Sequence, residues 1–185
     1  MSEKFCLSLT DQEKAYLKGL VTWSISLQFN SKPAVNHPEP PTDKMNLSMG
    51  VFVTLTVDNR LRGCIGSLTG RGPLYLTVIA MARAAAFEDT RFPPLNLAEF
   101  ERIKVELSIL GPIERCLNPN DIEIGRHGLM IRQGRHSGLL LPQVAMDRQW
   151  DQVTFLNQTC RKAGLADQAW NDPKSELYWF EAEVF

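Results

Sequence analysis

The sequence of 185 residues predicts an α+β protein, in which a mainly antiparallel sheet built from hairpins packs against helices. Two pairs of apolar segments are each joined by a short polar turn, as antiparallel strands are. Three segments of helical periodicity are mixed with these hairpins, which favours an α+β fold over a doubly wound one. The content of 44% hydrophobic and 22% charged residues is typical of a folded globular chain.

Each of the three predicted helices has a recognisable start or stop. The first follows Thr10, which forms a capping box with Glu13 three residues later. The second is opened by Pro73 and runs through the alanine-rich "VIAMARAAAF", whose small side chains indicate close packing against a sheet. The third lies after Pro142, carries apolar residues in helical register from Val153 and ends at Gly164, which is placed as its C-cap.

The predicted strands show an alternation of apolar and other residues. A first hairpin joins "VFVTLTV", which starts at Val51, to "LRGCIG", which starts at Leu61. A single half-buried strand, "IKVELSIL", follows at Ile103. A second hairpin lies in "GLMIRQGRHSGLLLP", and "ELYWFEAEVF" supplies a last strand. Residues 30–44 hold four prolines and no periodicity, which indicates an extended surface segment.

Charge, hydropathy and cysteine usage exclude several classes of protein. A net charge of -1 and the lack of a basic run argue against nucleic-acid binding. The apolar stretches are too short to span a bilayer, and the first residues lack the apolar core of a signal peptide, so a cytoplasmic protein is expected. The four cysteines form no C-x-x-C pair, which indicates reduced thiols rather than a disulfide framework.

Cys64 in "LRGCIG" is the strongest candidate for a functional side chain, since glycines on both sides let another group approach closely. Strict alternation along the strand places Arg62 on the same face, where its charge can stabilise a thiolate or hold an anionic ligand. The alternative is that Cys64 is a small buried hydrophobic residue, because cysteine is among the most buried residue types.

His127, in a glycine-bounded segment that leads into a strand, is the most plausible general base for Cys64. Of the other two histidines, His136 lies in a hairpin turn and His37 in the proline-rich segment. A metal site can be drawn from Cys64, His127 and His136, but no spacing demands it. The sequence therefore predicts no metal and no cofactor.

Two loops carry a functional and a structural interpretation each. "GSLTGRGP" can bind an anion through backbone N–H groups at the start of the following helix, or it is a plain turn; it lacks the Gly-Lys-Ser/Thr of a Walker A loop. Asp89 and Arg91 in "FEDTRFPPL" either form a structural ion pair that fixes this loop or line a cleft.

Several motifs follow one another along the chain: "LRGCIG", "AFEDTRFPPL", "IGRHGL", "GLLLPQVA", Trp150 and "FLNQTCRKAGL". In this order they resemble the AMMECR domain family, which in prokaryotes includes protein A of the AmmeMemoRadiSam system. The resemblance spans residues 5–185 and implies one compact α+β domain in two unequal lobes with a cleft between them. The system context implies a Memo-like protein and a radical-SAM protein as partners.

The resemblance also implies which positions form a site. The family's motif positions carried onto this chain include Arg62, Gly63, Cys64, Gly66, Asp89, Arg91, His127 and Gln143. One hypothesis is an enzyme for acyl or group transfer, in which His127 activates the Cys64 nucleophile. In it Arg62 and Arg91 hold an anionic group, and Gln143 donates a hydrogen bond. The other is a non-catalytic binding or adaptor module that recognises a small-molecule ligand or a partner's peptide.

Overall fold

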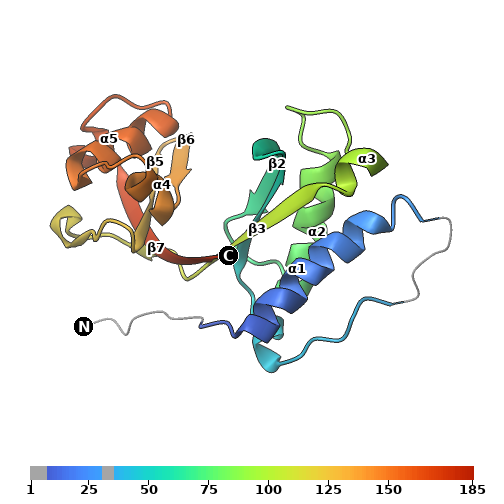
Figure 1. Ribbon diagram of the computed structural model, residues 1–185. Coiled ribbons are helices and arrows are strands. Elements are labelled where there is room, and N and C mark those ends of the chain that lie inside the picture. Colours follow the sequence, from blue (N-terminus) through green and yellow to red (C-terminus); the bar gives the residue numbers. More distant parts are fainter. Residues whose placement is uncertain (1–7, 31–35) are drawn as a thin grey trace. The chain divides into compact units, whose positions relative to one another are not determined.

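The computed structural model describes residues 8–30 and 36–185, and the chain divides into two compact units (Figure 1). Of the described residues, the N-terminal unit comprises 8–30, 36–110 and 183–185, and the C-terminal unit comprises 111–182. Each unit combines antiparallel strands with helices, so the predicted α+β class is confirmed. The cleft between two lobes and the single domain over residues 5–185 stay predictions.

The N-terminal unit begins with α1 (Asp11–Ser26), and the predicted capping box is present. The Thr10 hydroxyl accepts the Glu13 N–H at 3.2 Å, and the Glu13 carboxylate accepts the Thr10 N–H at 2.7 Å. The same carboxylate is buried and accepts the hydroxyl of Thr42, which lowers its pKa to about 2. Glu13 thereby ties the segment at Thr42 to the start of the helix.

The sheet of the N-terminal unit has the strand order β2-β1-β3, with β2 at one edge. The strands are β1 (Gly50–Val57), β2 (Arg60–Ser67) and β3 (Ile103–Leu110), and both pairs are antiparallel. Phe185 exchanges two main-chain hydrogen bonds with Leu107 on the other side of β3. The first predicted hairpin and the predicted strand at Ile103 are therefore confirmed.

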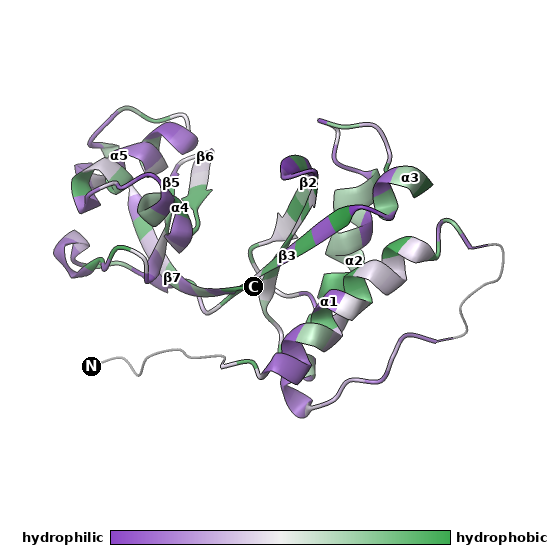
Figure 2. Cartoon of the chain, in the orientation of Figure 1, coloured by the Kyte–Doolittle hydropathy of each residue, from purple (hydrophilic) through white to green (hydrophobic). Residues whose placement is uncertain are grey.

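One face of this sheet is covered by α1 and by α2 (Leu74–Phe87). Val51, Val53 and Leu55 alternate along β1 and are completely buried on this face. α2 is hydrophobic along most of its length (Figure 2). This composition is expected because the helix packs against both the sheet and α1. Short elements that the sequence did not indicate are the 3-10 helix η1 (Asp43–Asn46) and α3 (Leu97–Phe100).

The C-terminal unit holds strands in the order β7-β5-β6, and the short β4 (Glu114–Arg115) pairs with β7. The second predicted hairpin is confirmed as β5 (His127–Gln133) and β6 (His136–Leu140). The last predicted strand is β7 (Glu176–Val184), and the third predicted helix is α5 (Gln152–Lys162). The helix expected after Pro142 is divided into α4 (Pro142–Asp147) and α5. The 3-10 helices η2 (Pro119–Asp121) and η3 (Ala169–Asn171) were not anticipated.

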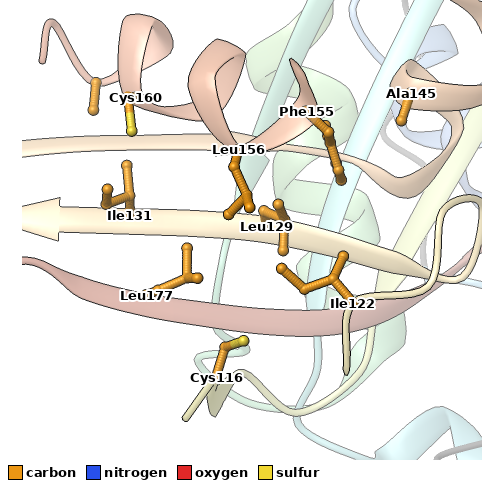
Figure 3. Close-up of a cluster of buried hydrophobic side chains, with 10 residues drawn as sticks. Cys116, Ile122, Leu129, Ile131, Ala145, Phe155, Leu156, Cys160 and Leu177 are labelled. Carbon is orange, nitrogen blue, oxygen red and sulfur yellow. The ribbon is translucent and has the colours of Figure 1, made fainter. Parts of the chain in front are cut away.

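A buried cluster joins α5 to the strands of this unit (Figure 3). Phe155 and Leu156 of α5 pack with Leu129 and Ile131 of β5. Cys160 belongs to the same cluster, so it is a core residue. Of the proline-rich segment, residues 36–42 are irregular as predicted and residues 31–35 lie outside the described residues. Within the described part of the chain, no helix is both long and apolar enough to cross a membrane.

Candidate functional site

Cys64 lies on β2, and a β-bulge precedes it. Leu55 of β1 pairs with Gly63, but the next residue, Thr56, pairs with Leu61, so Arg62 is an extra residue in the ladder. The alternation of side chains breaks at this point. The strict alternation from which a shared face of Arg62 and Cys64 was predicted therefore does not hold at this position.

Arg62 binds a carboxylate instead of the thiol. Its guanidinium donates to both carboxylate oxygens of Glu99, at 2.8 and 2.9 Å, and to the Pro93 carbonyl oxygen at 2.8 Å. Arg62 is buried, and the hydrogen bonds from Arg62 lower the pKa of Glu99. This fork-shaped pair fixes α3 and the loop before it to the bulge.

Asp89 and Arg91 close the edge of β2 at Cys64. The Cys64 N–H donates to Asp89 Oδ2 at 2.9 Å, and Arg91 Nη2 donates to the Cys64 carbonyl oxygen at 3.1 Å. The two side chains also bind each other, with Arg91 Nε and Nη2 at 2.9 and 2.7 Å from the carboxylate. The structural ion pair considered for this loop is therefore present, and it substitutes for a neighbouring strand.

The electrostatics of this ion pair favour a charged carboxylate. Asp89 is buried, whereas the Arg91 side chain is 54% exposed. The hydrogen bonds from Arg91 hold the pKa of Asp89 well below its usual range, although burial opposes this shift. Asp89 therefore stays ionised at every physiological pH.

The glycines around Cys64 are explained by close packing. A Cβ atom at Gly63 would collide with the main-chain oxygen of Ala85 in α2. A Cβ atom at Gly66 would collide with the Phe52 ring and would lie 2.5 Å from the Val51 carbonyl oxygen. Gly63 thus allows the alanine-rich helix to approach β2, and Gly66 leaves room for an aromatic ring.

The Cys64 thiol is partly buried and lies 3.3 Å from the Thr54 hydroxyl. Since the main-chain groups of Cys64 point away from β1, the two residues form a non-hydrogen-bonded pair, in which side chains are close. Thr54 in turn pairs with Glu106 of β3, whose side chain is exposed. Cys64, Thr54 and Glu106 thus form a row across one face of the sheet, opposite the face that α2 covers.

His127 and Gln143 belong to the C-terminal unit. His127 is buried, and its Nδ1 accepts the Glu123 main-chain N–H at 3.0 Å. Burial lowers its pKa, with a further contribution from Arg126. The neutral ring therefore carries its proton on Nε2, where it can donate a hydrogen bond but cannot accept a proton. A role as general base requires the loss of the hydrogen bond from Glu123.

The predicted site residues thus fall into two groups, with His127 and Gln143 in the C-terminal unit and the others in the N-terminal unit. The N-terminal unit brings together Cys64, Arg62, Gly63, Gly66, Asp89 and Arg91. The Oε1 atom of Gln143 is buried without a hydrogen-bond partner in the described structure. Residues 8–30 and 36–185 contain no group of three or more His, Cys, Asp or Glu side chains placed to hold a metal ion.

A groove that the sequence did not indicate lies beside β2. It has a volume of about 460 Å³, and its walls are the end of β2, the following loop and α2. Its apolar lining includes Ile65, Leu76 and Met81, and its charged residues are Arg71 and Glu88. The loop "GSLTGRGP", in which an anion site was one interpretation, forms one end of this groove.

Comparison with known proteins gives several matches over most of the chain. A family model described as AMMECR1 matches residues 20–185. Protein MK0488 of Methanopyrus kandleri is 42% identical over 186 residues, which cover 96% of this chain and 89% of that protein. Protein NEQ441 of Nanoarchaeum equitans is 43% identical over 155 residues, which cover 80% and 86%. The crystal structure of the uncharacterized protein PH0010 from Pyrococcus horikoshii is similar with a TM-score of 0.85 and 37% identity, covering 95% and 92% of the two chains.

Proposed function

The chain belongs to the AMMECR1 family of uncharacterised proteins, and we propose that it is a binding module whose groove beside β2 holds a segment of a partner protein. The observation that carries this proposal is the groove itself. It is apolar over most of its lining and is built entirely by the N-terminal unit. Its volume lies within the range of about 300–1,000 Å³ that is typical of ligand sites.

The contacts around Cys64 support binding rather than catalysis. The two charged residues that were expected to hold an anionic substrate, Arg62 and Arg91, already bind the carboxylates of Glu99 and Asp89. The acceptor nitrogen of His127 is also occupied, so the expected base lacks a free acceptor. Arg62, Asp89 and Arg91 fix the edge strand β2 and the loop that borders it, as a rigid binding surface requires.

The proposed partners are the Memo-like protein and the radical-SAM protein of the AmmeMemoRadiSam system. Binding of each to the purified chain, measured at micromolar concentration by calorimetry, tests the proposal. Ala80 lines the groove and is exposed, so A80W fills the groove and is expected to abolish binding. L97W, at an exposed position of α3, is the matched control. Equal binding by A80W and the unchanged chain would contradict the proposal.

Thiol chemistry at Cys64 is the second candidate, and the accessible thiol beside the Thr54 hydroxyl favours it. In this scheme Sγ attacks the carbonyl carbon of an activated acyl donor, its proton passes to water, and the donor's leaving group departs. A thioester at Cys64 after incubation with an acyl donor, detected by mass spectrometry and absent in C64A, supports this candidate. Partner binding that survives C64A supports the binding module instead.

A further inference from the structure

We propose that the segment in the groove is an extended peptide that adds to β2 as a new antiparallel strand beside Gly66, with an acidic residue next to Arg71. This inference rests on the proposed function above and specifies its ligand. Three observations carry it: an open stretch of strand edge, an apolar wall beside that stretch, and opposite charges at the two ends of the wall.

The open stretch starts two residues after Cys64. The Cys64 N–H and carbonyl point away from β1, since they bind Asp89 and Arg91. The ladder from Cys64 to Ser67 has no register shift, so the main-chain groups of Gly66 point in the same direction. In the described structure no hydrogen bond occupies them. In the described structure the main-chain groups at the edge of β2 are thus hydrogen-bonded at Cys64 and free at Gly66.

The apolar wall accepts every second side chain of an added strand. Ile65 lies on the α2 side of β2, and α2 contributes Leu76, Ala80 and Met81 to the same groove. A residue paired with Gly66 points to the opposite face, so its two neighbours point into the groove. Peptides recognised by strand addition combine main-chain hydrogen bonds with pockets for alternate side chains in this way.

The charges at the ends of the wall set the direction and composition of the peptide. Arg71 precedes α2, whose N-cap Pro73 supplies no side-chain hydrogen bond, so the guanidinium and the helix dipole both favour an anion. Glu88 is the C-cap residue at the other end of α2. Neither residue forms an ion pair in the described part of the chain.

Arg71 lies near the end of β2, so an antiparallel peptide begins at Arg71 with an acidic residue and ends at Glu88 with a basic one. Antiparallel pairing is also the slightly more stable arrangement. α2 has 14 residues and is about 21 Å long, which an extended segment of seven residues matches. Because Asp89 and Arg91 occupy the edge at Cys64, this segment pairs with β2 only through its fourth residue, opposite Gly66, and its last residues follow α2 towards Glu88. The fitting sequence therefore has an acidic residue first, apolar residues third and fifth, and a basic residue seventh.

The test uses synthetic heptapeptides with a fluorescent label, measured by fluorescence anisotropy. The first probe is acetyl-Glu-Thr-Ile-Thr-Ile-Thr-Lys-amide, and the second has its glutamate and lysine exchanged. Only the first is expected to bind the unchanged chain. The variant R71E is expected to weaken binding of the first probe about tenfold and to strengthen binding of the second. Binding of both probes with equal affinity would overturn the assignment of charges and direction.

N-methylation separates strand addition from simple apolar binding. The N–H of the central threonine faces β2 and the N–H of the next isoleucine faces solvent, because the two alternate along a strand. N-methylation of the threonine is expected to weaken binding of the first probe at least about tenfold, because one hydrogen bond to β2 is lost. N-methylation of the isoleucine is the matched control. Equal loss with both peptides, or with neither, overturns strand addition.

The variant A80W distinguishes failure of this inference from failure of the proposed function. If neither heptapeptide binds but A80W still abolishes partner binding, the peptide assignment is wrong and the groove remains the binding site. If heptapeptide and partner binding are both unaffected by A80W, both proposals are overturned. Loss of both in A80W, with L97W unaffected, supports both.

Discussion

The carboxylate of Asp89 accepts the main-chain N–H of Cys64 at 2.9 Å, so a side chain takes the place of a neighbouring strand. Arg91 completes the substitution, because it donates to the carbonyl of the same residue and also binds Asp89. An edge strand that keeps its N–H and carbonyl groups free is a template for pairing with another chain. The Asp89–Arg91 pair therefore limits the open edge of β2 to the stretch that starts at Gly66.

We expect D89N to lower the free energy of unfolding by about 1–3 kcal/mol, because it weakens the bonds to Cys64 and Arg91 together. The pKa of Asp89 is lowered in the folded state, so its contribution is present above the ordinary carboxyl pKa. That contribution is lost as the pH falls towards the folded pKa. Urea unfolding between pH 3 and pH 7 measures it. An unchanged stability of D89N at pH 7 would show that the pair contributes nothing.

The two glycines of the motif are expected to tolerate a methyl group to different degrees. G63A places Cβ against the Ala85 backbone, and we expect it to destabilise the fold by about 3 kcal/mol or more. G66A places Cβ against the Phe52 ring and the Val51 carbonyl oxygen; its closest main-chain contact is longer than that of G63A, so a smaller but still substantial loss is expected. G19A, in α1, is the control, since a Cβ atom there would meet open space, and it should stabilise the protein by about 0.5–1 kcal/mol. Thermal unfolding of the three variants gives the order, and a G63A variant as stable as G19A is incompatible with the packing described.

Among the three described cysteines, Cys64 is expected to react first with iodoacetamide. Burial raises the pKa of Cys116 to about 11 and also raises that of Cys160, and both thiols lie in the core of the C-terminal unit. Mass spectrometry of peptides after alkylation at pH 7–9 gives the rate at each cysteine. Alkylation of Cys64 only after denaturation would exclude thiol chemistry as a function.

The His127 ring is expected to gain its second proton at a lower pH than an ordinary histidine, since burial lowers its pKa. The unfolded chain then binds a proton that the folded chain does not, so stability falls as the pH drops below the unfolded pKa. Nitrogen-15 chemical shifts of the ring should show the proton on Nε2. A proton on Nδ1 would contradict the hydrogen bond from Glu123 and would restore Nε2 as a candidate base.

Local signals in the sequence predicted much of the fold. The capping box at Thr10 and the alternation in both hairpins correspond to α1 and to the pairs β1–β2 and β5–β6. The bulge at Arg62 was missed because a period of two contains no mark of one inserted residue. The short helix α3 was missed because four residues are too few to establish a helical period.

The candidate site was predictable in its residues but not in their contacts. The motifs pointed to Cys64, Asp89 and Arg91, which do meet, but the partner of Arg62 lies 37 residues away at Glu99. The groove depends on how α2 packs on β2, which no local pattern specifies. One signal for that packing was available, since glycine in a strand followed by an alanine-rich helix indicates close approach of backbones.

Amide hydrogen exchange of Cys64 and Gly66, followed by NMR in the unliganded protein, tests the central claim most directly. The account predicts slow exchange at Cys64, whose N–H is bound by Asp89, and fast exchange at Gly66, whose N–H faces the open edge. D89N should accelerate exchange at Cys64 and leave Gly66 unchanged. Equal protection of the two amides in the free protein would mean that the edge at Gly66 is already occupied, and it would contradict the account.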